Sequence, residues 1–265
     1  MSRTTRALTT AVAAALALSA GVVPAAQAAD ESLTAQLFFR DGTVVDVFRP
    51  YERLFMADTG QGEELLTFYR GRWTAAGGAW ERSFSFGRPG DVAVVGDWDG
   101  DGVDEPGVVR GNRYHLASEA VDGGGGVRSF TFGSPSMYHG AVGDWDGDGV
   151  DEPMAVTGAG RSIRFWFATE QADGGGTPYA RDWGRNLGDG FAVGDVDGDG
   201  TDSITLQRPN LSGGAPTFYI STTSPRDGLR ADVILSYGRN IDAPVLADVS
   251  GDERDEVGVL REYLW

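Results

Sequence analysis

Gly143-Asp144-Trp145-Asp146-Gly147-Asp148-Gly149-Val150-Asp151-Glu152 is the stretch that decides the architecture, because the chain repeats it. Close copies lie at residues 96–105 and 194–203, and a more divergent copy lies at 247–256. The intervals between their first aspartates are 47, 51 and 53 residues, counted along Asp97, Asp144, Asp195 and Asp248. A repeat of this length predicts an array of similar units, such as a solenoid or a propeller.

A second marker recurs between the acidic copies, and it is an aromatic run that ends in a glycine turn. Its forms are Phe86-Gly87-Arg88-Pro89, Phe132-Gly133-Ser134-Pro135, Trp183-Gly184-Arg185-Asn186 and Tyr237-Gly238-Arg239-Asn240. Phe48-Arg49-Pro50 resembles the first form, and Pro50 precedes Asp58 by the same interval that separates Pro89 from Asp97. We therefore interpret residues 58–64 as a fifth, decayed loop that has lost its middle carboxylates and is not expected to hold a cation.

Each unit contains short runs rich in β-branched and aromatic residues, and turn residues separate them. In the second unit the expected strands are 92–95, 107–110, 113–117 and 129–132. Four short strands per unit are typical of a propeller blade. The sequence predicts an all-β propeller of five blades, at about 51–87, 91–133, 138–184, 189–238 and 242–265 together with 33–48.

The two ends of the chain are expected to meet in the last blade. The last unit stops early, at Trp265, whereas residues 33–48 form a surplus hairpin at the start. We expect this hairpin to complete the last blade, which would remove exposed strand edges. An ordinary hairpin beside an incomplete array is the alternative.

The first residues have the pattern of a secretory signal peptide. Arg3 and Arg6 precede an apolar run at 11–23, and Ala26-Gln27-Ala28 is a small-residue cleavage site. We expect residues 1–28 to be removed and residues 29–265 to form one secreted domain, with a retained N-terminal anchor as the alternative. The chain has no cysteine, so metal ions are the expected substitute for disulfides in that compartment.

The formal net charge is −17, and it becomes −19 without Arg3 and Arg6. A surface of this sign repels nucleic-acid phosphates and anionic lipids. We therefore expect no nucleic-acid partner and no membrane insertion, and we expect a monomer that binds an extracellular protein or glycan.

The acidic loops predict binding of a hard cation. Asp-x-Asp-x-Asp-Gly places three carboxylates at alternating positions of a tight loop, and Ca²⁺ takes six to eight oxygen ligands. The ligands expected in the first complete loop are Asp97, Asp99, Asp101, the carbonyl of Val103, and Asp104 or Glu105. In the next loop they are Asp144, Asp146, Asp148, Val150, and Asp151 or Glu152. In the third they are Asp195, Asp197, Asp199, Thr201 and Asp202.

The last loop is less complete than the other three. It offers Asp248, Ser250 and Asp252, because Ser250 replaces a carboxylate and Glu253 replaces the turn glycine. A solvated acidic turn is the alternative for any single loop, but three near-identical loops favour a cation. Flanking strands exclude an EF-hand, and Mg²⁺ resists an all-protein cage, so Ca²⁺ is the expected ion.

The strands, the Asp-x-Asp-x-Asp-Gly loops and the Phe-Gly turns together resemble the FG-GAP/VCBS repeats, which include the calcium-binding blades of integrin α-subunit propellers. The resemblance covers most of the mature chain and implies a calcium-stabilised β-propeller used for extracellular binding or adhesion. The ninth loop position is usually Asp in that family, whereas here it is Glu105, Glu152, Ser203 and Glu256. Integrin propellers have seven blades in larger chains, so integrin-like ligand binding is not carried over.

No catalytic motif stands out. The two histidines, His115 and His139, have no nucleophile with a recognisable motif nearby, and no nucleophile elbow or phosphate loop is present. We expect a binding module that is not an enzyme. A lectin-like carbohydrate-binding propeller and a polysaccharide lyase or hydrolase are the alternatives, and either would require a site that the sequence does not display.

Overall fold

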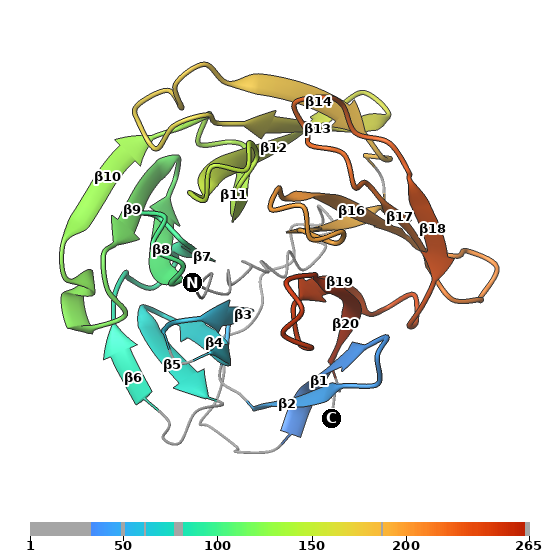
Figure 1. The fold of residues 1–265 in the computed structure, drawn as a ribbon, viewed down its shortest axis with the longest axis horizontal. Coiled ribbons are helices and arrows are strands. Elements are labelled where there is room, and N and C mark those ends of the chain that lie inside the picture. The colour runs from blue at the N-terminus through green and yellow to red at the C-terminus, as the bar shows by residue number, and fades with distance from the viewer. Residues whose placement is uncertain (1–32, 49–50, 61, 77–81, 187, 263–265) are drawn as a thin grey trace.

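The computed structural model describes residues 33–48, 51–60, 62–76, 82–186 and 188–262. In this part of the chain, five four-stranded antiparallel sheets are arranged in a ring as the blades of a propeller (Figure 1). This confirms the predicted fold. The expected signal peptide, residues 1–28, lies outside the described residues.

The first four blades are each built from four consecutive strands. The first blade comprises β3 (Arg53–Asp58), β4 (Glu63–Tyr69), β5 (Arg72–Ala76) and β6 (Arg82–Ser85). The second comprises β7 (Val92–Gly96), β8 (Glu105–Arg110), β9 (Arg113–Ala117) and β10 (Val127–Thr131), and a short 3-10 turn at Asp122–Gly124 joins its last two strands. The third comprises β11 (Tyr138–Gly143), β12 (Glu152–Ala159), β13 (Ser162–Phe167) and β14 (Tyr179–Trp183). The fourth comprises β15 (Gly190–Gly194), β16 (Ser203–Arg208), β17 (Thr217–Ile220) and β18 (Val233–Ser236).

The fifth blade joins the two ends of the described chain, as the surplus hairpin predicted. Its strand order is β19 (Ala243–Ala247), β20 (Glu256–Glu262), β1 (Leu33–Phe39) and β2 (Val44–Phe48). Leu37 of β1 lies opposite Leu260 of β20 in an antiparallel pairing. This closure pairs an edge of β20 that would otherwise be open.

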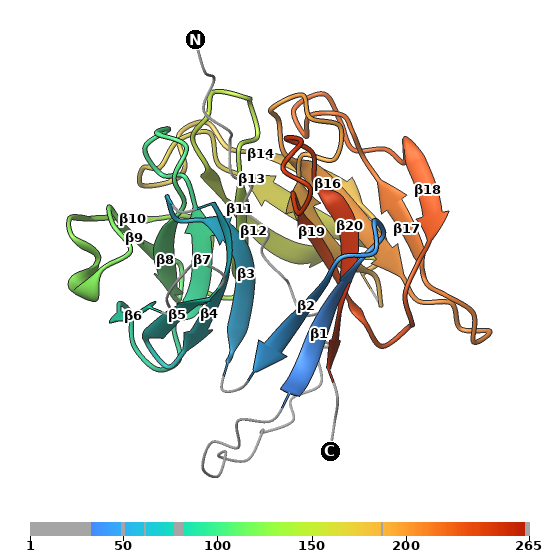
Figure 2. The ribbon, with the colours of Figure 1, turned by 60° about the horizontal axis from the view of Figure 1, so that its bottom comes forward.

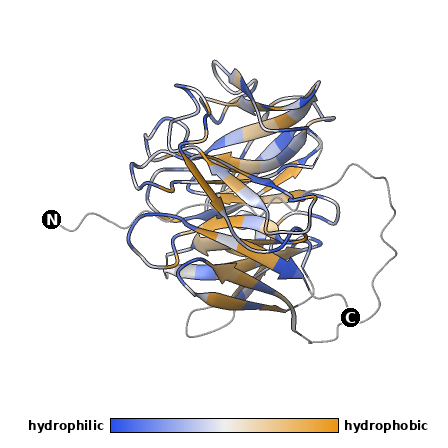
Figure 3. Ribbon diagram, turned by 90° about the vertical axis from the view of Figure 1, so that its right-hand side faces the viewer, coloured by the Kyte–Doolittle hydropathy of each residue, from blue (hydrophilic) through white to orange (hydrophobic). Residues whose placement is uncertain are grey.

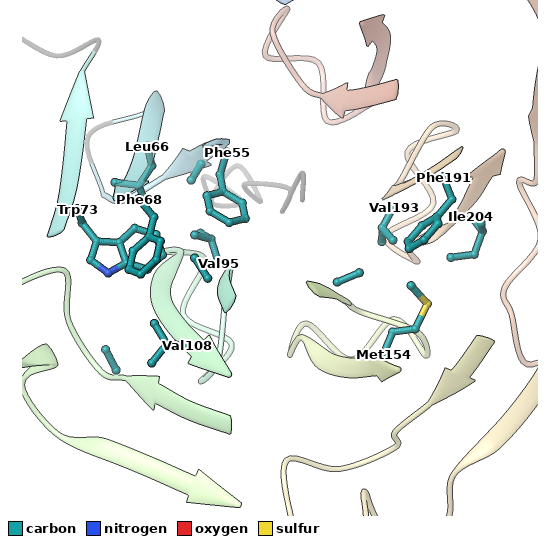
Figure 4. Close-up of a cluster of buried hydrophobic side chains, with 14 of the residues drawn as sticks. Phe55, Leu66, Phe68, Trp73, Val95, Val108, Met154, Phe191, Val193 and Ile204 are labelled. Carbon is teal, nitrogen blue, oxygen red and sulfur yellow. The ribbon is translucent and has the colours of Figure 1, made fainter. Parts of the chain in front are cut away.

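The core lies between neighbouring blades, because each blade is too thin to bury its own faces. Every residue of β15 is buried, and β7 is buried except at its first residue. Figure 4 shows Phe55, Phe68 and Trp73 of the first blade beside Val95 and Val108 of the second. The outermost strands are more exposed, and Figure 3 shows that hydrophobic colour follows the strands more than the loops.

A repeated ion pair fixes the start of three innermost strands. Asp91, just before β7, accepts hydrogen bonds from the guanidinium of Arg110 at 2.6 and 2.8 Å. The same Asp–Arg pair recurs as Asp189–Arg208 and Asp242–Arg261. Each of these carboxylates also accepts a backbone N–H from the preceding connector, which ties the blade-to-blade turn to the sheet.

Candidate metal centres

Each acidic loop connects the innermost strand of a blade to its second strand. The loops after β7, β11, β15 and β19 therefore lie at the same end of the propeller, at the top of Figure 2. We call this end the loop face. The structure places all four predicted copies of the motif in equivalent positions.

The first aspartate folds each loop around its own carboxylate. Asp97 Oδ1 accepts the N–H groups of Gly100 at 2.7 Å and Asp101 at 3.2 Å, and Oδ2 accepts that of Gly102 at 2.8 Å. Gly100 and Gly102 have φ values of 78° and 85°, which L side chains rarely adopt. Asp144, Asp195 and Asp248 accept the equivalent backbone bonds in their own loops.

Three loops bring their alternating carboxylates to one point. In the sets Asp97–Asp99–Asp101, Asp144–Asp146–Asp148 and Asp195–Asp197–Asp199, one oxygen of each residue lies within 4.8 Å of the others. Two oxygens on a single Ca²⁺ at about 2.3–2.6 Å can be about 5 Å apart at most. The carboxylates therefore have the spacing of a shared cation site.

The last loop gathers a different set. Its converging oxygens belong to Asp248, Asp252 and Glu256, so the ninth position supplies the third carboxylate. Ser250, at the third position, has no carboxylate to add to this group, and its hydroxyl stays a predicted ligand. Glu256 was missing from the predicted set of this loop, although the repeat aligns it with the ninth-position residues Glu105 and Glu152.

The ninth-position glutamates turn toward their own loops. Glu105 Oε2 accepts the N–H of Trp98 at 3.4 Å, and Glu256 Oε2 accepts that of Val249 at 3.0 Å. Burial, reinforced by the loop aspartates, raises the pKa of Glu105 to about 8 and that of Glu152 to about 9. Glu152 Oε2 is buried and has no hydrogen-bond partner among the described residues.

The eighth-position aspartates contact the preceding blade instead. Asp151 Oδ2 accepts the backbone N–H of Asp97 at 3.1 Å, and the Asp151 N–H donates to the Asp97 carbonyl at 2.8 Å. Asp104 makes the same two bonds to Asp58, and Asp202 makes them to Asp144. The sequence left the eighth and ninth positions open as ligands, and in this geometry the ninth faces the loop while the eighth links two blades.

The seventh residues, Val103, Val150 and Thr201, donate their N–H groups to the fifth-position aspartates at 2.8–2.9 Å. Their carbonyls stay predicted ligands. The fourth blade has Ser203 at the ninth position, and its hydroxyl donates to the carbonyl of Thr223 at 2.9 Å. That loop therefore has three converging aspartates and no ninth carboxylate.

In the first blade, an arginine from the outermost strand pairs with the glutamate at the end of the decayed loop. Glu64 lies opposite Ala57, the register that Glu105 has opposite Gly96. The Glu64 carboxylate, which is 5% exposed, accepts from Arg82 at 3.0 Å and from the Thr59 hydroxyl at 2.9 Å. The positive charge beside the decayed loop is thus the guanidinium of Arg82. No motif in the sequence indicated this pairing.

One further arginine approaches a loop from outside. Arg226, between β17 and β18, lies 3.2 Å from Asp146, and its side chain is 51% exposed. An ion pair this exposed contributes little to stability. A cation that binds the loop can therefore replace Arg226 as the partner of Asp146.

Searches of protein-family models, curated proteins and solved structures return no match to this chain. The fold and the loop geometry therefore carry the functional argument on their own. Among the residues described, none belongs to a helix with the length and hydropathy needed to cross a membrane.

Proposed function

We propose that the protein is a secreted, calcium-binding module of the FG-GAP/VCBS type that acts in extracellular binding or adhesion without catalysis. The cations are structural in this proposal. They offset part of the negative charge of the loop face and hold each loop in the shape that its neighbouring blade contacts.

The contrast between Glu152 and Glu64 carries the proposal. Both glutamates are buried at the same register beside an acidic loop. Glu64 has the guanidinium of Arg82, whereas Glu152 has a buried oxygen without a partner among the described residues and is repelled by the charges of the loop aspartates. A buried carboxylate needs a compensating charge or a proton. Ca²⁺ supplies that charge and fits an all-oxygen donor set.

The histidines support a role without acid–base chemistry. His139 is buried, with Nε2 at 2.7 Å from the Ser134 carbonyl and Nδ1 at 3.2 Å from the Tyr114 hydroxyl. Burial lowers the pKa of both His139 and His115. His115 Nδ1 lies 2.8 Å from Ser129 Oγ. Both rings thus hold positions within or beside a sheet.

Calorimetric titration of the metal-free mature protein with Ca²⁺ tests the metal sites. We expect binding of several ions and a rise in melting temperature, because the ions bind only the folded loops. Asp146→Ala should remove one site from the stoichiometry, whereas Asp46→Ala, outside the loops, should leave it unchanged. A melting curve that does not change between exhaustive chelation and saturating Ca²⁺ would contradict the proposal.

The binding role needs a separate test on the calcium-loaded protein. A glycan array and a pull-down on extracellular matrix proteins should yield a ligand without turnover. Release of reducing or unsaturated sugars from plant or bacterial polysaccharides would overturn the non-catalytic assignment. Glycan hits alone would favour the lectin-like alternative.

A further inference from the structure

The charge of this protein is divided between the two ends of the propeller. In an antiparallel blade, the connectors between blades and the turns between second and third strands lie at the end opposite the acidic loops. We call this end the connector face; it includes residues 86–91, 184–186, 188–189, 208–216 and 237–242. The net charge of −17 is a sum over the whole chain, to which the acidic loops contribute strongly. The balance of charge on the connector face has to be counted separately.

The connector face exposes guanidinium groups. Arg88, Arg185 and Arg239 occupy the same position after the glycine of three connectors, and all three are exposed. The nearby carboxylates do not offset them at the surface. Asp91, Asp189 and Asp242 have side chains only 3%, 1% and 0% exposed.

Each of those carboxylates is covered by an arginine of its own blade, at 2.6–2.7 Å from Arg110, Arg208 and Arg261. Arg70 and Arg161, in the strand turns of the first and third blades, add two more exposed cations. The exposed acids on this face include Glu52 and Glu262, which accept hydrogen bonds from the Arg70 N–H and the Tyr51 hydroxyl.

Two apolar side chains project from the same face. Leu211 is 98% exposed and Ile241 is 81% exposed, more than any other large apolar residue among those described. Their segments are tied together, because Asn210 N–H donates to Asn240 Oδ1 at 2.7 Å and Asn240 Nδ2 donates to the Asn210 carbonyl at 2.6 Å. The two side chains therefore project from adjoining turns that are held to each other, with Arg208 and Arg239 near them in the chain.

We propose that the connector face docks on an anionic phospholipid bilayer, with Leu211 and Ile241 entering the headgroup region and the arginines facing lipid phosphates. Guanidinium groups bind phosphate oxygens in a bidentate manner. Basic residues near an anionic surface and apolar side chains in the headgroup region each contribute to reversible membrane binding, and their contributions add. The acidic loop face is repelled by the same surface, so it orients away from the lipid. The net charge alone predicts that anionic lipids repel the protein. The proposed docking departs from that prediction, because the charge of the connector face differs from that of the whole chain.

A soluble polyanion would use the arginines but would leave Leu211 and Ile241 in water. The apolar pair therefore distinguishes a bilayer from a polysaccharide or a nucleic acid. The proposal is independent of the calcium sites, because no residue of the loop face takes part in it.

Vesicle co-sedimentation tests the proposal, with the mature protein kept in Ca²⁺ so that all variants stay folded. The probes are vesicles of phosphatidylcholine with phosphatidylglycerol and vesicles of phosphatidylcholine alone. The test variants are Leu211→Ser/Ile241→Ser and Arg185→Gln/Arg239→Gln. The matched controls are Val121→Ser and Arg230→Gln, which change exposed residues in loops at the other ends of the strands. Thermal melts of each variant confirm that the fold is kept.

We expect binding to the anionic vesicles only, and weaker binding at high salt. The arginine variant should bind about fivefold more weakly for each arginine removed, and the apolar variant about tenfold more weakly. Both controls should bind like the wild type. Absence of binding to anionic vesicles would overturn the proposal, as would an equal loss in the controls. Unchanged binding by Leu211→Ser/Ile241→Ser would also overturn it, and binding of that variant to dextran sulfate would then assign the face to soluble polyanions.

Discussion

Asp151, which the motif offers as a ligand of its own loop, is hydrogen-bonded twice to the backbone of Asp97 in the preceding blade. Asp97 is in turn the residue around which the preceding loop folds. The two candidate metal centres are thus joined through one short contact. The contact recurs between Asp104 and Asp58 and between Asp202 and Asp144, so the acidic loops form a linked series around the loop face.

Replacing Asp151 tests this link. Asp151→Ala leaves the buried N–H of Asp97 without its acceptor, which should lower the free energy of unfolding by about 1–3 kcal/mol. Asp151→Asn keeps an oxygen acceptor and should lose less. Denaturant unfolding of the calcium-free proteins measures both. If Asp151→Ala instead lost one calcium site and kept its calcium-free stability, Asp151 would be a ligand and the inter-blade link would be unimportant.

Gly143 should be required because Asp202 of the next blade occupies the space of a side chain. A Cβ added at Gly143 would lie 2.6 Å from Asp202 Oδ2 and 2.9 Å from the Trp145 ring. We expect Gly143→Ala to lower the free energy of unfolding by about 1–3 kcal/mol through overpacking. In a double-mutant cycle with Asp202→Ala, the two losses should be clearly less than additive. Additive losses would show that the two residues do not share this space.

The buried Asp–Arg pairs should matter more than the exposed pair of the same chemistry. Asp189→Ala leaves the Arg208 guanidinium and the Arg185 N–H without their carboxylate, and we expect a loss of about 2–4 kcal/mol. The matched control is Asp182, because both side chains of its pair with Arg164 are exposed to solvent. Asp182→Ala should change the unfolding free energy far less, because water and salt screen a pair that is exposed on both sides. Equal effects in urea unfolding would contradict this ranking.

The calcium-free protein should become less stable as pH rises. Glu105 and Glu152 have pKa values of about 8 and about 9 in the fold, above the ordinary 4.5, because burial disfavours their charged forms. Between pH 4.5 and 8 the folded state therefore holds more protons than the unfolded state. Each group then lowers the unfolding free energy by up to about 1.4 kcal/mol per pH unit.

Urea unfolding at pH 5 and pH 8, with and without Ca²⁺, measures this dependence. Saturating Ca²⁺ should reduce the difference, because the ion favours the charged carboxylates. Glu152→Gln should reduce it in the calcium-free protein, because the amide does not titrate. A calcium-free protein that is more stable at pH 8 than at pH 5 would contradict the assignment of these two glutamates.

The sequence by itself determined the repeat, the five blades and the closure by residues 33–48, because glycine turns and alternating apolar residues act locally and recur at a fixed interval. It also located the aspartates that converge in three loops, since alternating positions of one tight turn are neighbours in space. These features need no knowledge of what lies beside each blade.

Only the tertiary structure decided what the flanking residues do. Asp151 and Glu152 are adjacent carboxylates, and the pleat of the strand sends them in opposite directions, one to the preceding blade and one to its own loop. Arg82 reaches Glu64 from another strand, and Leu211 and Ile241 project from neighbouring turns of two blades. Such contacts depend on how the sheets twist and stack around the ring, and no local pattern in the chain records that arrangement.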